Sequence, residues 1–301
     1  FVKFLRDIQK RERPDLLGVA FDPKGGSFRR DIFPEYKANR AETPEDILLS
    51  VPYVKRVLEA MCIPILEVEG YEADDVIGTL SQKGVAAGYD VYMVTPDKDY
   101  GQLVRDNCRI YKQKGADGAI EIVGREAIRE KYGIDDPVLV RDILALWGDA
   151  SDNIPGVPGI GEKTALKLIA TYGSLDGVYE ALPTAKETPS VLRKLTEGRE
   201  SAYLSQMLAR ICRTVPLGMP LDGLEAAGED RAKLRELFLR LEFSGFIKRF
   251  GLDVPDVPSQ TSQTETASAT PAAATRTQKP LRRHWRTFPP LRLIALRKEF
   301  I

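Results

Sequence analysis

Mostly apolar runs stand at regular intervals in the first hundred residues of the chain, at 16–21, 63–68 and 90–95. Apolar runs of this length are typical of strands that are buried on both faces of a parallel sheet. Between them, apolar residues recur at helical spacing, at 1–12, 43–61 and 73–80. This alternation of strand and helix predicts an α/β fold.

From residue 109 onward the pattern changes. Residues 109–123 predict two short strands around a glycine-containing turn. Beyond Gly124 helical periodicity dominates, and it predicts helices at 125–132, 138–146, 163–172, 175–182, 191–195, 202–213 and 231–241. We therefore expect an α/β domain over residues 1–123 and a helical region over residues 124–255.

The last part of the chain, residues 256–301, has a composition of its own. Residues 261–277 are rich in Ser, Thr, Ala and Pro, which predicts a flexible linker. Residues 281–301 are basic and contain Trp285 and Phe288, so they are either a nucleic-acid-binding tail or an end unrelated to the rest. We expect a disordered linker and tail outside the fold.

The charge of the chain is balanced but unevenly distributed. Among 301 residues, 44 are basic and 44 are acidic, yet residues 261–301 hold eight basic and two acidic side chains. The first 260 residues therefore carry a net charge of −6, so bulk charge does not predict a nucleic-acid partner. Such a partner has to be inferred from individual sites.

Cysteine and histidine are scarce. Cys62, Cys108 and Cys212 form no redox or metal-binding pair and no disulfide framework, which is typical of a reducing cytoplasm. The only histidine, His284, lies in the tail, so histidine-based catalysis in the core is excluded. No apolar run is long enough to span a membrane, and no signal peptide is visible. The chain begins with Phe1 inside a predicted helix, from which we expect an N-terminal truncation.

Acidic residues follow each predicted buried strand: Asp22, then Glu72, Asp74 and Asp75, then Asp97 and Asp99. Each group alone has a structural explanation, either as turn residues or as acids favoured at a helix N-terminus. Together they predict one acidic edge, because ligands bind outside the carboxyl ends of the strands in open α/β sheets. Clustered carboxylates repel one another unless cations lie among them, so we interpret this edge as a divalent-metal site.

A second acidic stretch, rich in glycine, lies at 148–165. Asp149 and Asp152 are three positions apart, so a helical turn would place both carboxylates on one side. Gly159 and Gly161 lead into a predicted helix, where glycine allows a close backbone approach and helix N–H groups bind phosphate. The alternative is an ordinary Gly/Pro turn between packed helices. The neighbouring Asp pair favours a clamp on a DNA backbone.

The predicted loop at 25–40 combines basic and aromatic side chains, among them Arg29, Tyr36, Lys37 and Arg40. It is either a solvated connector or a segment that grips a nucleic-acid strand. The second interpretation follows from the chemistry of the side chains, because cations neutralise phosphates and aromatic rings stack on bases.

These motifs occur together, and in the same order, in one known family. The chain resembles the 5′-nuclease domain of bacterial DNA polymerase I, in the 5′-exonuclease and flap-endonuclease superfamily. The resemblance covers about residues 1–255 and depends on the segments 21–24, 27–29, 36–40, 70–75, 95–99, 102–103 and 148–165. It implies a PIN-like mixed sheet flanked by helices, followed by a helical region with a helix-three-turn-helix element.

The resemblance also implies an activity, which is hydrolysis of phosphodiester bonds in DNA and RNA primers during replication and repair. The expected partner is DNA with a 5′ flap, a nick or a primer–template duplex, and the expected parent protein carries a polymerase domain. No membrane is involved. The implied cofactors are two Mg²⁺ ions, for which Mn²⁺ can substitute, and a K⁺ ion at the DNA clamp.

Residue roles follow from the same resemblance. Ligands of the first metal ion are expected to be Asp22, Glu72, Asp74 and Asp75, and those of the second Asp97, Asp99, Asp149 and Asp152. Lys37 and Arg40 are expected to contact the scissile phosphate. The expected DNA contacts are Arg29, Gly159, Gly161, Lys163 and Thr164. Backbone carbonyls expected to bind K⁺ are those of Leu146, Trp147, Pro155, Val157 and Ile160.

One departure from the family leaves an alternative open. The resemblance implies an Asp-bearing strand before Phe1, so the first metal site of this sequence would be incomplete. A non-catalytic fragment that binds DNA junctions is therefore the second hypothesis. A metal-dependent phosphatase is a weaker third hypothesis, because it would have no need of the segment 156–163.

Overall fold

The computed structural model describes all residues except 115–118, 226, 254–291 and 298–301. The chain divides into two compact units, one made of Phe1–Glu229 with Pro290–Ile301 and the other of Asp230–Pro289. Over the described ranges, no helix combines the length and the apolar character that crossing a membrane requires.

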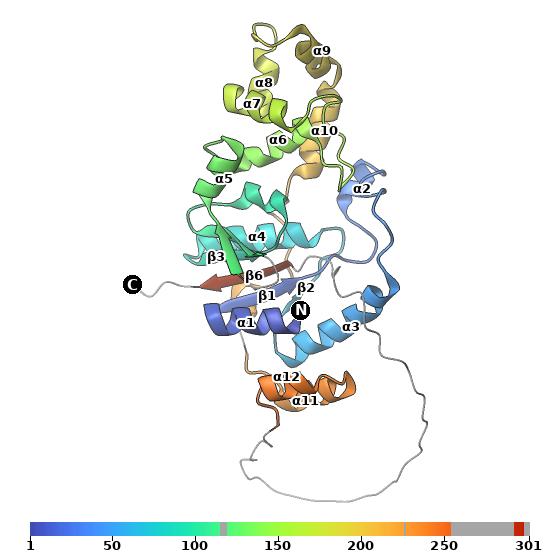
Figure 1. The fold of residues 1–301 in the computed structure, drawn as a ribbon, viewed down its shortest axis with the longest axis vertical. Helices are drawn as coiled ribbons and strands as arrows, with labels where there is room; N and C mark the ends of the chain where they lie inside the picture. The colour runs from blue at the N-terminus through green and yellow to red at the C-terminus, as the bar shows by residue number, and fades with distance from the viewer. Residues whose placement is uncertain (115–118, 226, 254–291, 298–301) are drawn as a thin grey trace, which may run out of the picture. The chain divides into compact units, whose positions relative to one another are not determined.

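Six strands of the described residues form a mixed sheet in the first unit, in the order β2-β1-β6-β3-β4-β5 (Figure 1). Parallel pairing joins β1 to β2 and β3 to β4, whereas β6 is antiparallel to both of its neighbours and β5 is antiparallel to β4. The mixed α/β sheet confirms the predicted fold class. The strands are β1 (Leu16–Ala20), β2 (Ile65–Leu66), β3 (Asp90–Val94), β4 (Cys108–Lys114), β5 (Ala119–Val123) and β6 (Arg292–Arg297).

Strand β6 corrects one expectation. The whole of 256–301 was expected to be a linker and tail outside the fold, yet Arg292–Arg297 is a central strand of the sheet. The physical reason is the uninterrupted apolar run Leu293–Leu296, whose side chains are all buried. An apolar strand between β1 and β3 pairs backbone groups that would otherwise lack partners. Residues 256–291 and 298–301 lie outside the described residues.

Helices cover both faces of the sheet. On one face, α4 (Ala73–Ala86) approaches β6 so closely at Gly84 that a Cβ there would overlap Leu296. On the other face, Ile8 of α1 (Val2–Glu12) lines a small cavity together with Tyr92 and Ala295. Adjacent strand residues point to opposite faces, which places α1 and α4 on opposite sides of the sheet (Figure 1). Helix α3 (Glu45–Ala60) precedes β2, and the short α2 (Phe28–Ile32) lies in the segment predicted to be a loop.

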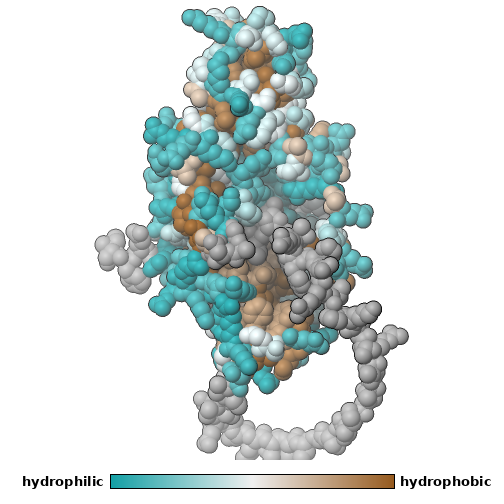
Figure 2. Space-filling view, viewed as in Figure 1, coloured by the Kyte–Doolittle hydropathy of each residue, from teal (hydrophilic) through white to brown (hydrophobic). Residues whose placement is uncertain are grey.

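A helical half follows the sheet within the same unit. Helix α6 packs against α7 and α10, and one continuous core joins these helices to α4 and the sheet. On the face drawn in Figure 2, hydrophilic residues predominate over the helical half, as expected when the apolar helix faces are turned inward. The elements are η1 (Lys98–Leu103), α5 (Arg125–Tyr132), η2 (Pro137–Leu139), α6 (Val140–Trp147), α7 (Glu162–Tyr172), α8 (Leu175–Ala181), α9 (Pro189–Glu197), α10 (Arg199–Ala209) and η3 (Leu221–Leu224).

The second unit contains α11 (Arg231–Arg240) and α12 (Ser244–Arg249). Asp230 caps α11 by accepting a hydrogen bond from the Lys233 N–H. Phe238 packs edge-on against Phe250 with ring centroids 5.2 Å apart, so an aromatic cluster holds this helix pair together.

Candidate active site

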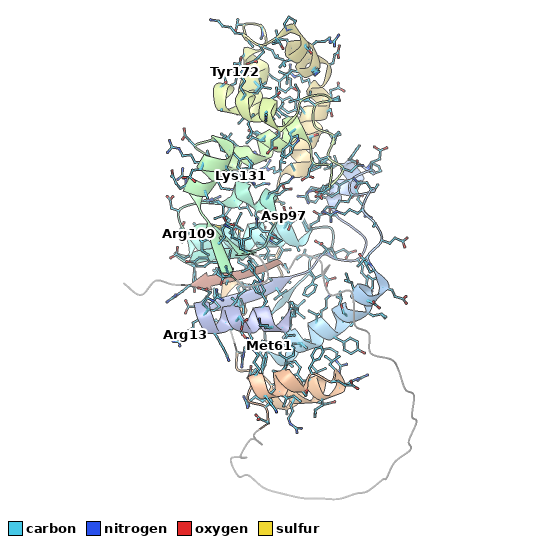
Figure 3. The ribbon with its side chains drawn as sticks, viewed as in Figure 1. Arg13, Met61, Asp97, Arg109, Lys131 and Tyr172 are labelled. Atoms are coloured by element: carbon cyan, nitrogen blue, oxygen red, sulfur yellow. The ribbon has the colours of Figure 1, made fainter. Side chains whose placement is uncertain are left out.

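The ends of the parallel strands bring acids to one edge of the sheet, as predicted. Asp22 lies just after β1, and its Oδ1 atom accepts a hydrogen bond from the Ala73 N–H at the start of α4 (2.8 Å). Glu72 immediately precedes the same helix. Asp97 follows β3 and caps η1, since its Oδ1 atom accepts a hydrogen bond from the Asp99 N–H (3.0 Å). Figure 3 labels Asp97, which lies where the sheet meets the helical half.

The helical half contributes two further acids from the loop between α6 and α7. Asp149 and Ile154 exchange two backbone hydrogen bonds of 2.9 and 2.8 Å, so the residues between them form a tight turn rather than the predicted helical turn. Asp152 lies within this turn. The Lys98 ammonium of η1 lies 2.8 Å from Asp149 Oδ2, which connects the loop to the edge of the sheet.

Glu72 and Asp152 lie on either side of a tyrosine and a lysine. The Tyr36 hydroxyl is 3.2 Å from a carboxylate oxygen of each acid. The Lys37 ammonium is 2.8 Å from Glu72 and 3.6 Å from Asp152. Burial alone would raise the pKa of Glu72, but the positive charges of Lys37 and Arg29 outweigh burial and lower that pKa. This carboxylate is therefore ionised at neutral pH.

Asp99 lies among like charges on the other side of the site. Burial raises the pKa of Asp99 well above its ordinary value, and the neighbouring charges of Asp97, Asp149 and Asp152 raise it further. Its Oδ1 atom is buried and has no hydrogen-bond partner among the described residues. A buried carboxylate oxygen without a donor is costly, and a divalent cation is the group that would satisfy it.

The unpartnered Asp99 oxygen shows that the carboxylates fit a metal site. They are not, however, already arranged around one metal position. Within the part of the chain that the structure describes, no three His, Cys, Asp or Glu side chains surround a common metal position. Lysine, arginine and tyrosine side chains face several of the acids instead. Lys98 faces Asp149, and Arg40 faces Asp152. A cation would have to replace these contacts.

The basic loop that was predicted to grip a strand lies against the acidic loop. The Asn39 side chain donates to the Ala150 carbonyl (2.6 Å), and the Lys37 N–H donates to the Asp152 carbonyl (2.9 Å). The Arg40 guanidinium pairs with the Asp152 carboxylate and is 46% exposed. The structure therefore brings Lys37 and Arg40 to the acids, with Arg40 on the solvent side.

Asp74 and an open cleft complete the edge. The Tyr100 hydroxyl of η1 donates to Asp74 Oδ1 (2.6 Å), so this acid also faces the site. A cleft of about 410 Å³ begins beside Asp97 and continues along β4, β5 and α5, where Lys131 lines it. Figure 3 labels both Asp97 and Lys131. Solvent and ligands can thus approach Asp97 from this side.

Asp75 and Arg29 contradict their predicted roles. The two carboxylate oxygens of Asp75 accept both Arg29 guanidinium nitrogens at 2.8 Å as well as the N–H groups of Cys212 and Glu72. Asp75 is 0% exposed and Arg29 is 2% exposed. A carboxylate with four donors has no room for a metal ion, and a buried guanidinium cannot reach DNA phosphate. This ion pair joins α2 to α4 and, through the Leu208 carbonyl, to α10.

The residues predicted to form a DNA clamp lie at and just before the start of α7. Gly161 precedes the helix, and the exposed Lys163 and the partly exposed Thr164 lie in its first turn. Gly159 has a φ of +79°, a conformation that glycine adopts without strain. Lys194 of α9 donates to the Gly159 carbonyl (3.0 Å), which adds a second cation beside this turn.

The carbonyls predicted to bind K⁺ lie where two backbone segments cross. A Cβ on Gly156 would overlap the backbone of Gly148, so only glycine allows this approach. Beside the crossing, the Leu146 carbonyl accepts a hydrogen bond from the Val157 N–H (2.8 Å), and the Val157 carbonyl accepts one from the Ile160 N–H (2.9 Å). The structure therefore brings together the segments that carry the predicted oxygens, those of Leu146, Trp147, Pro155, Val157 and Ile160.

The sequence analysis did not predict the contacts that three residues make with the acids. Tyr36 links Glu72 to Asp152, Tyr100 binds Asp74, and Lys98 binds Asp149. Lys98 could have been found, because it stands between the two acids Asp97 and Asp99. Nothing in the local pattern distinguishes Tyr100 from an ordinary core tyrosine, and Tyr36 was predicted only as an aromatic residue of the basic loop, without its link to the acids.

Family models match most of the chain in two consecutive parts. Residues 1–133 match the 5′-3′ exonuclease N-terminal resolvase-like domain, and residues 136–232 match the 5′-3′ exonuclease C-terminal SAM fold. The chain belongs to the 5′-3′ exonuclease family. The order of an α/β part and a helical part agrees with the fold described above and confirms the predicted fold class.

Relatives of this exonuclease-family chain are longer than the chain itself. It is 40% identical over 272 residues to DNA polymerase I of Caldicellulosiruptor bescii, an alignment that covers 85% of this chain and 32% of the polymerase. DNA polymerase I of Bacillus caldotenax is 39% identical over 249 residues, which are 83% of this chain and 28% of the polymerase. The chain therefore spans about a third of the length of these relatives.

A solved structure of T5 5′-exonuclease with bound zinc ions has the same fold. It superposes with a TM-score of 0.60 at 23% sequence identity, covering 80% of this chain and 89% of the T5 chain. At this level of identity the likeness supports the fold and leaves the chemistry to be argued from the residues.

Proposed function

We propose that this chain is a metal-dependent 5′-nuclease that hydrolyses phosphodiester bonds of DNA, and of RNA primers, at 5′ ends and 5′ flaps. The observation that carries the proposal is the convergence of acids around Asp99, whose buried Oδ1 oxygen has no partner among the described residues. Family membership supports the 5′-3′ direction and favours this function over the non-catalytic junction-binding alternative.

The acids divide into two groups that suit two cations. Asp97, Asp99 and Asp149 would hold one ion, and Glu72 with Asp22 and Asp74 would hold the other. Asp152 can serve both, because it shares Tyr36 with Glu72 and its charge acts on Asp99. Two bound Mg²⁺ ions, with Mn²⁺ as a substitute, would activate the attacking water and stabilise the leaving oxygen.

The chain's own cations would orient the substrate. Lys37 neutralises Glu72 and Arg40 neutralises Asp152. Bound metal ions would neutralise these acids instead, and both basic side chains would then be available to the scissile phosphate. Arg40 is half exposed and belongs to a surface loop, so it can turn toward a bound strand at little cost. The Tyr36 hydroxyl would keep the two loops in register.

The clamp would bind the duplex next to the site. The first turn of α7 offers backbone N–H groups to a phosphate, and Lys163 and Thr164 add a charge and a hydroxyl. A K⁺ ion held by carbonyls near Gly148 and Gly156 would add a further positive charge. The partners we propose are 5′-flap, nicked and primer–template DNA.

The wider context follows from the relatives. We propose that the natural protein carries a polymerase domain, acts in DNA replication and repair, and resides in the cytoplasm. Within the chain we propose residues 1–123 as the nuclease region and residues 124–255 as the DNA-binding region.

The test is cleavage of a labelled 5′-flap duplex by the full chain in the presence of Mg²⁺. We expect cleavage that EDTA abolishes and that Asp149→Asn lowers by about 100-fold, since losing a metal contact removes several kcal/mol of transition-state stabilisation. The matched control is Asp135→Asn, because the Asp135 side chain is 90% exposed.

Three results would overturn the proposal. They are an intact flap in the presence of Mg²⁺, cutting that persists in EDTA, and equal activity of the two Asn variants. Binding of the uncut flap duplex, measured in parallel by anisotropy, separates a failure of chemistry from a failure of the clamp.

A further inference from the structure

Four arginines gather in the first unit around Arg213. Burial lowers the pKa of Arg213, and the positive charges of three other arginines lower it further, those of Arg105, Arg210 and Arg141. The acid Asp136 acts on Arg213 in the opposite direction. Three elements contribute to this arginine cluster, since Arg105 follows η1, Arg141 lies in the first turn of α6, and the other two follow α10.

The arginine cluster has little compensating negative charge. Within the part of the chain that the structure describes, Arg141 is the only member that forms an ion pair, with its Nε atom 3.4 Å from Asp142 Oδ1. Asp106 stands next to Arg105 in the sequence but pairs with Arg125 instead (3.4 Å). Like charges held together without acids repel one another, and a bound anion would relieve that repulsion.

The segment 208–215, which carries Arg210 and Arg213, is fixed along its inner side. Buried side chains of α2, α4 and η1 bind its backbone, those of Arg29, Asp75, Thr79 and Gln102. The Gln102 amide alone makes two of these hydrogen bonds, each of 3.0 Å. Arg210 is exposed and Arg213 is partly exposed. A fixed backbone thus presents both guanidinium groups, which lowers the entropy cost of binding a ligand.

The cluster lies at the far ends of two elements that also position acids. Asp97 caps the start of η1, whereas Arg105 follows the end of that element. Arg141 lies in the first turn of α6, whereas Asp149 follows its last turn. A 3₁₀-helix of 6 residues and an α-helix of 8 residues are each roughly 12 Å long, so the cluster is separate from the acidic edge.

We propose that the arginine cluster binds phosphates of a nucleic-acid strand at a site separate from the acidic edge. A planar guanidinium can bind two phosphate oxygens at once, which makes arginine the preferred residue for this ligand. The first 260 residues carry a net charge of −6, so attraction of a nucleic acid needs a local positive patch such as this one. The choice of nucleic acid as the ligand rests on the proposed function.

The experiment measures binding of an uncut 5′-flap duplex to the full chain by fluorescence anisotropy, in EDTA and at several KCl concentrations. The test variant is Arg210→Gln with Arg213→Gln. We expect its Kd to rise about 10-fold at about 0.1 M KCl. The slope of log Kd against log [KCl] should fall by about 2, because two phosphate contacts are lost.

The matched control is Arg235→Gln with Arg240→Gln, which removes the same charge from exposed positions of α11. Its Kd and salt slope should equal those of the wild type. Arg210→Lys with Arg213→Lys should keep the salt slope but weaken binding, because lysine lacks the planar fork. If the Gln variant does not fold, Arg105→Gln tests the cluster from another element, with an expected loss of about 1 in the slope.

Cleavage in Mg²⁺ separates this inference from the proposed function. We expect the Arg210 and Arg213 variant to have a raised KM and an unchanged kcat, because its acids are intact. Asp149→Asn should lose cleavage while its binding in EDTA stays normal. If no chain cuts DNA but the arginine variant still binds it more weakly than the control does, the proposed function fails and the arginine site is supported.

Three outcomes would overturn the inference. The first is an equal Kd and an equal salt slope for the wild type and the arginine variant. The second is an equal loss of binding in the α11 control. The third is calorimetric binding of tripolyphosphate to the wild type and not to the arginine variant, together with unchanged DNA binding, which would assign the site to a free phosphate compound.

Discussion

The start of α4 and the start of η1 both carry acids at the same edge of the sheet, and they treat a buried carboxylate in opposite ways. At α4, Asp75 is fully buried and four donors satisfy it, two of them from the Arg29 guanidinium. At η1, Asp99 has a buried oxygen without a partner among the described residues and lies among three other acids. A compensated charge serves the fold, whereas an uncompensated one is costly and marks a place for a ligand.

The largest expected effect comes from breaking the compensated pair. Arg29→Ala leaves Asp75 as a buried, unpaired charge, so we expect the free energy of unfolding to fall by about 3–5 kcal/mol. Urea unfolding followed by circular dichroism measures this change. Burial alone would lower the pKa of Arg29, but the hydrogen bonds and charge of Asp75 outweigh burial and raise it, which shows how strongly the pair holds the proton.

Two controls accompany this prediction. Arg30→Ala removes an exposed neighbour and should change stability by less than about 0.5 kcal/mol. Replacing both partners, Arg29→Met with Asp75→Leu, should recover much of the loss, because an apolar pair needs no compensation. If Arg29→Ala is as stable as the wild type, the proposed contrast between Asp75 and Asp99 is wrong.

Removing the charge of Asp99, the acid with an oxygen that lacks a partner among the described residues, should raise the free energy of unfolding rather than lower it. Asp99→Asn removes a charge from the acidic group, so we expect the metal-free protein to gain about 0.5–2 kcal/mol while metal-dependent cleavage is lost. Because the pKa of Asp99 is raised in the folded state, the wild type loses stability relative to the variant as pH rises above 3.8. Unfolding of both proteins between about pH 3 and 8 tests the sign, and an advantage of the variant that shrinks with rising pH would contradict it.

Tyr36 is an intermediate case, because its neutral hydroxyl lies 3.2 Å from each of two acids and shares one proton between them. Burial and the charge of Glu72 raise the pKa of its hydroxyl, so it remains a donor. Tyr36→Phe should cost about 0.5–1.5 kcal/mol, the usual contribution of a hydrogen bond. The control is Tyr53→Phe, since Tyr53 is 37% exposed. Equal stabilities of the two variants in urea would show that the hydroxyl does not link Glu72 to Asp152.

The acidic edge could be predicted from the sequence because strand ends and acids are both visible in a local pattern. The difference between Asp74 and Asp75 could not, because neighbouring helix residues point about 100° apart and the pattern does not say which one faces the core. The structure shows the difference at Thr79. It lies one turn after Asp75 on the buried face of α4, where its hydroxyl bonds to the Asp75 carbonyl.

The misassigned tail has a different cause. Judged by charge, residues 281–301 are a basic tail with five arginines and one lysine against a single acid, and this hid the run Leu293–Leu296. Short apolar runs identify a strand, but they do not say which other strands it will join. That information is long-range, since β6 pairs with residues almost two hundred positions or more earlier in the chain.

The crossing of Gly148 and Gly156 connects the loop that carries two of the acids to the neighbouring helices. Ser205 and Ser201 of α10 fasten Gly156 from both sides, by accepting from its N–H (2.9 Å) and donating to its carbonyl (2.6 Å). Asp149 and Asp152 lie in the short loop between Gly148 and Gly156, which the crossing closes. If the first turn of α7 binds duplex DNA as proposed, any shift of that helix would move these two acids with it, and a misplaced duplex would also displace the acidic groups.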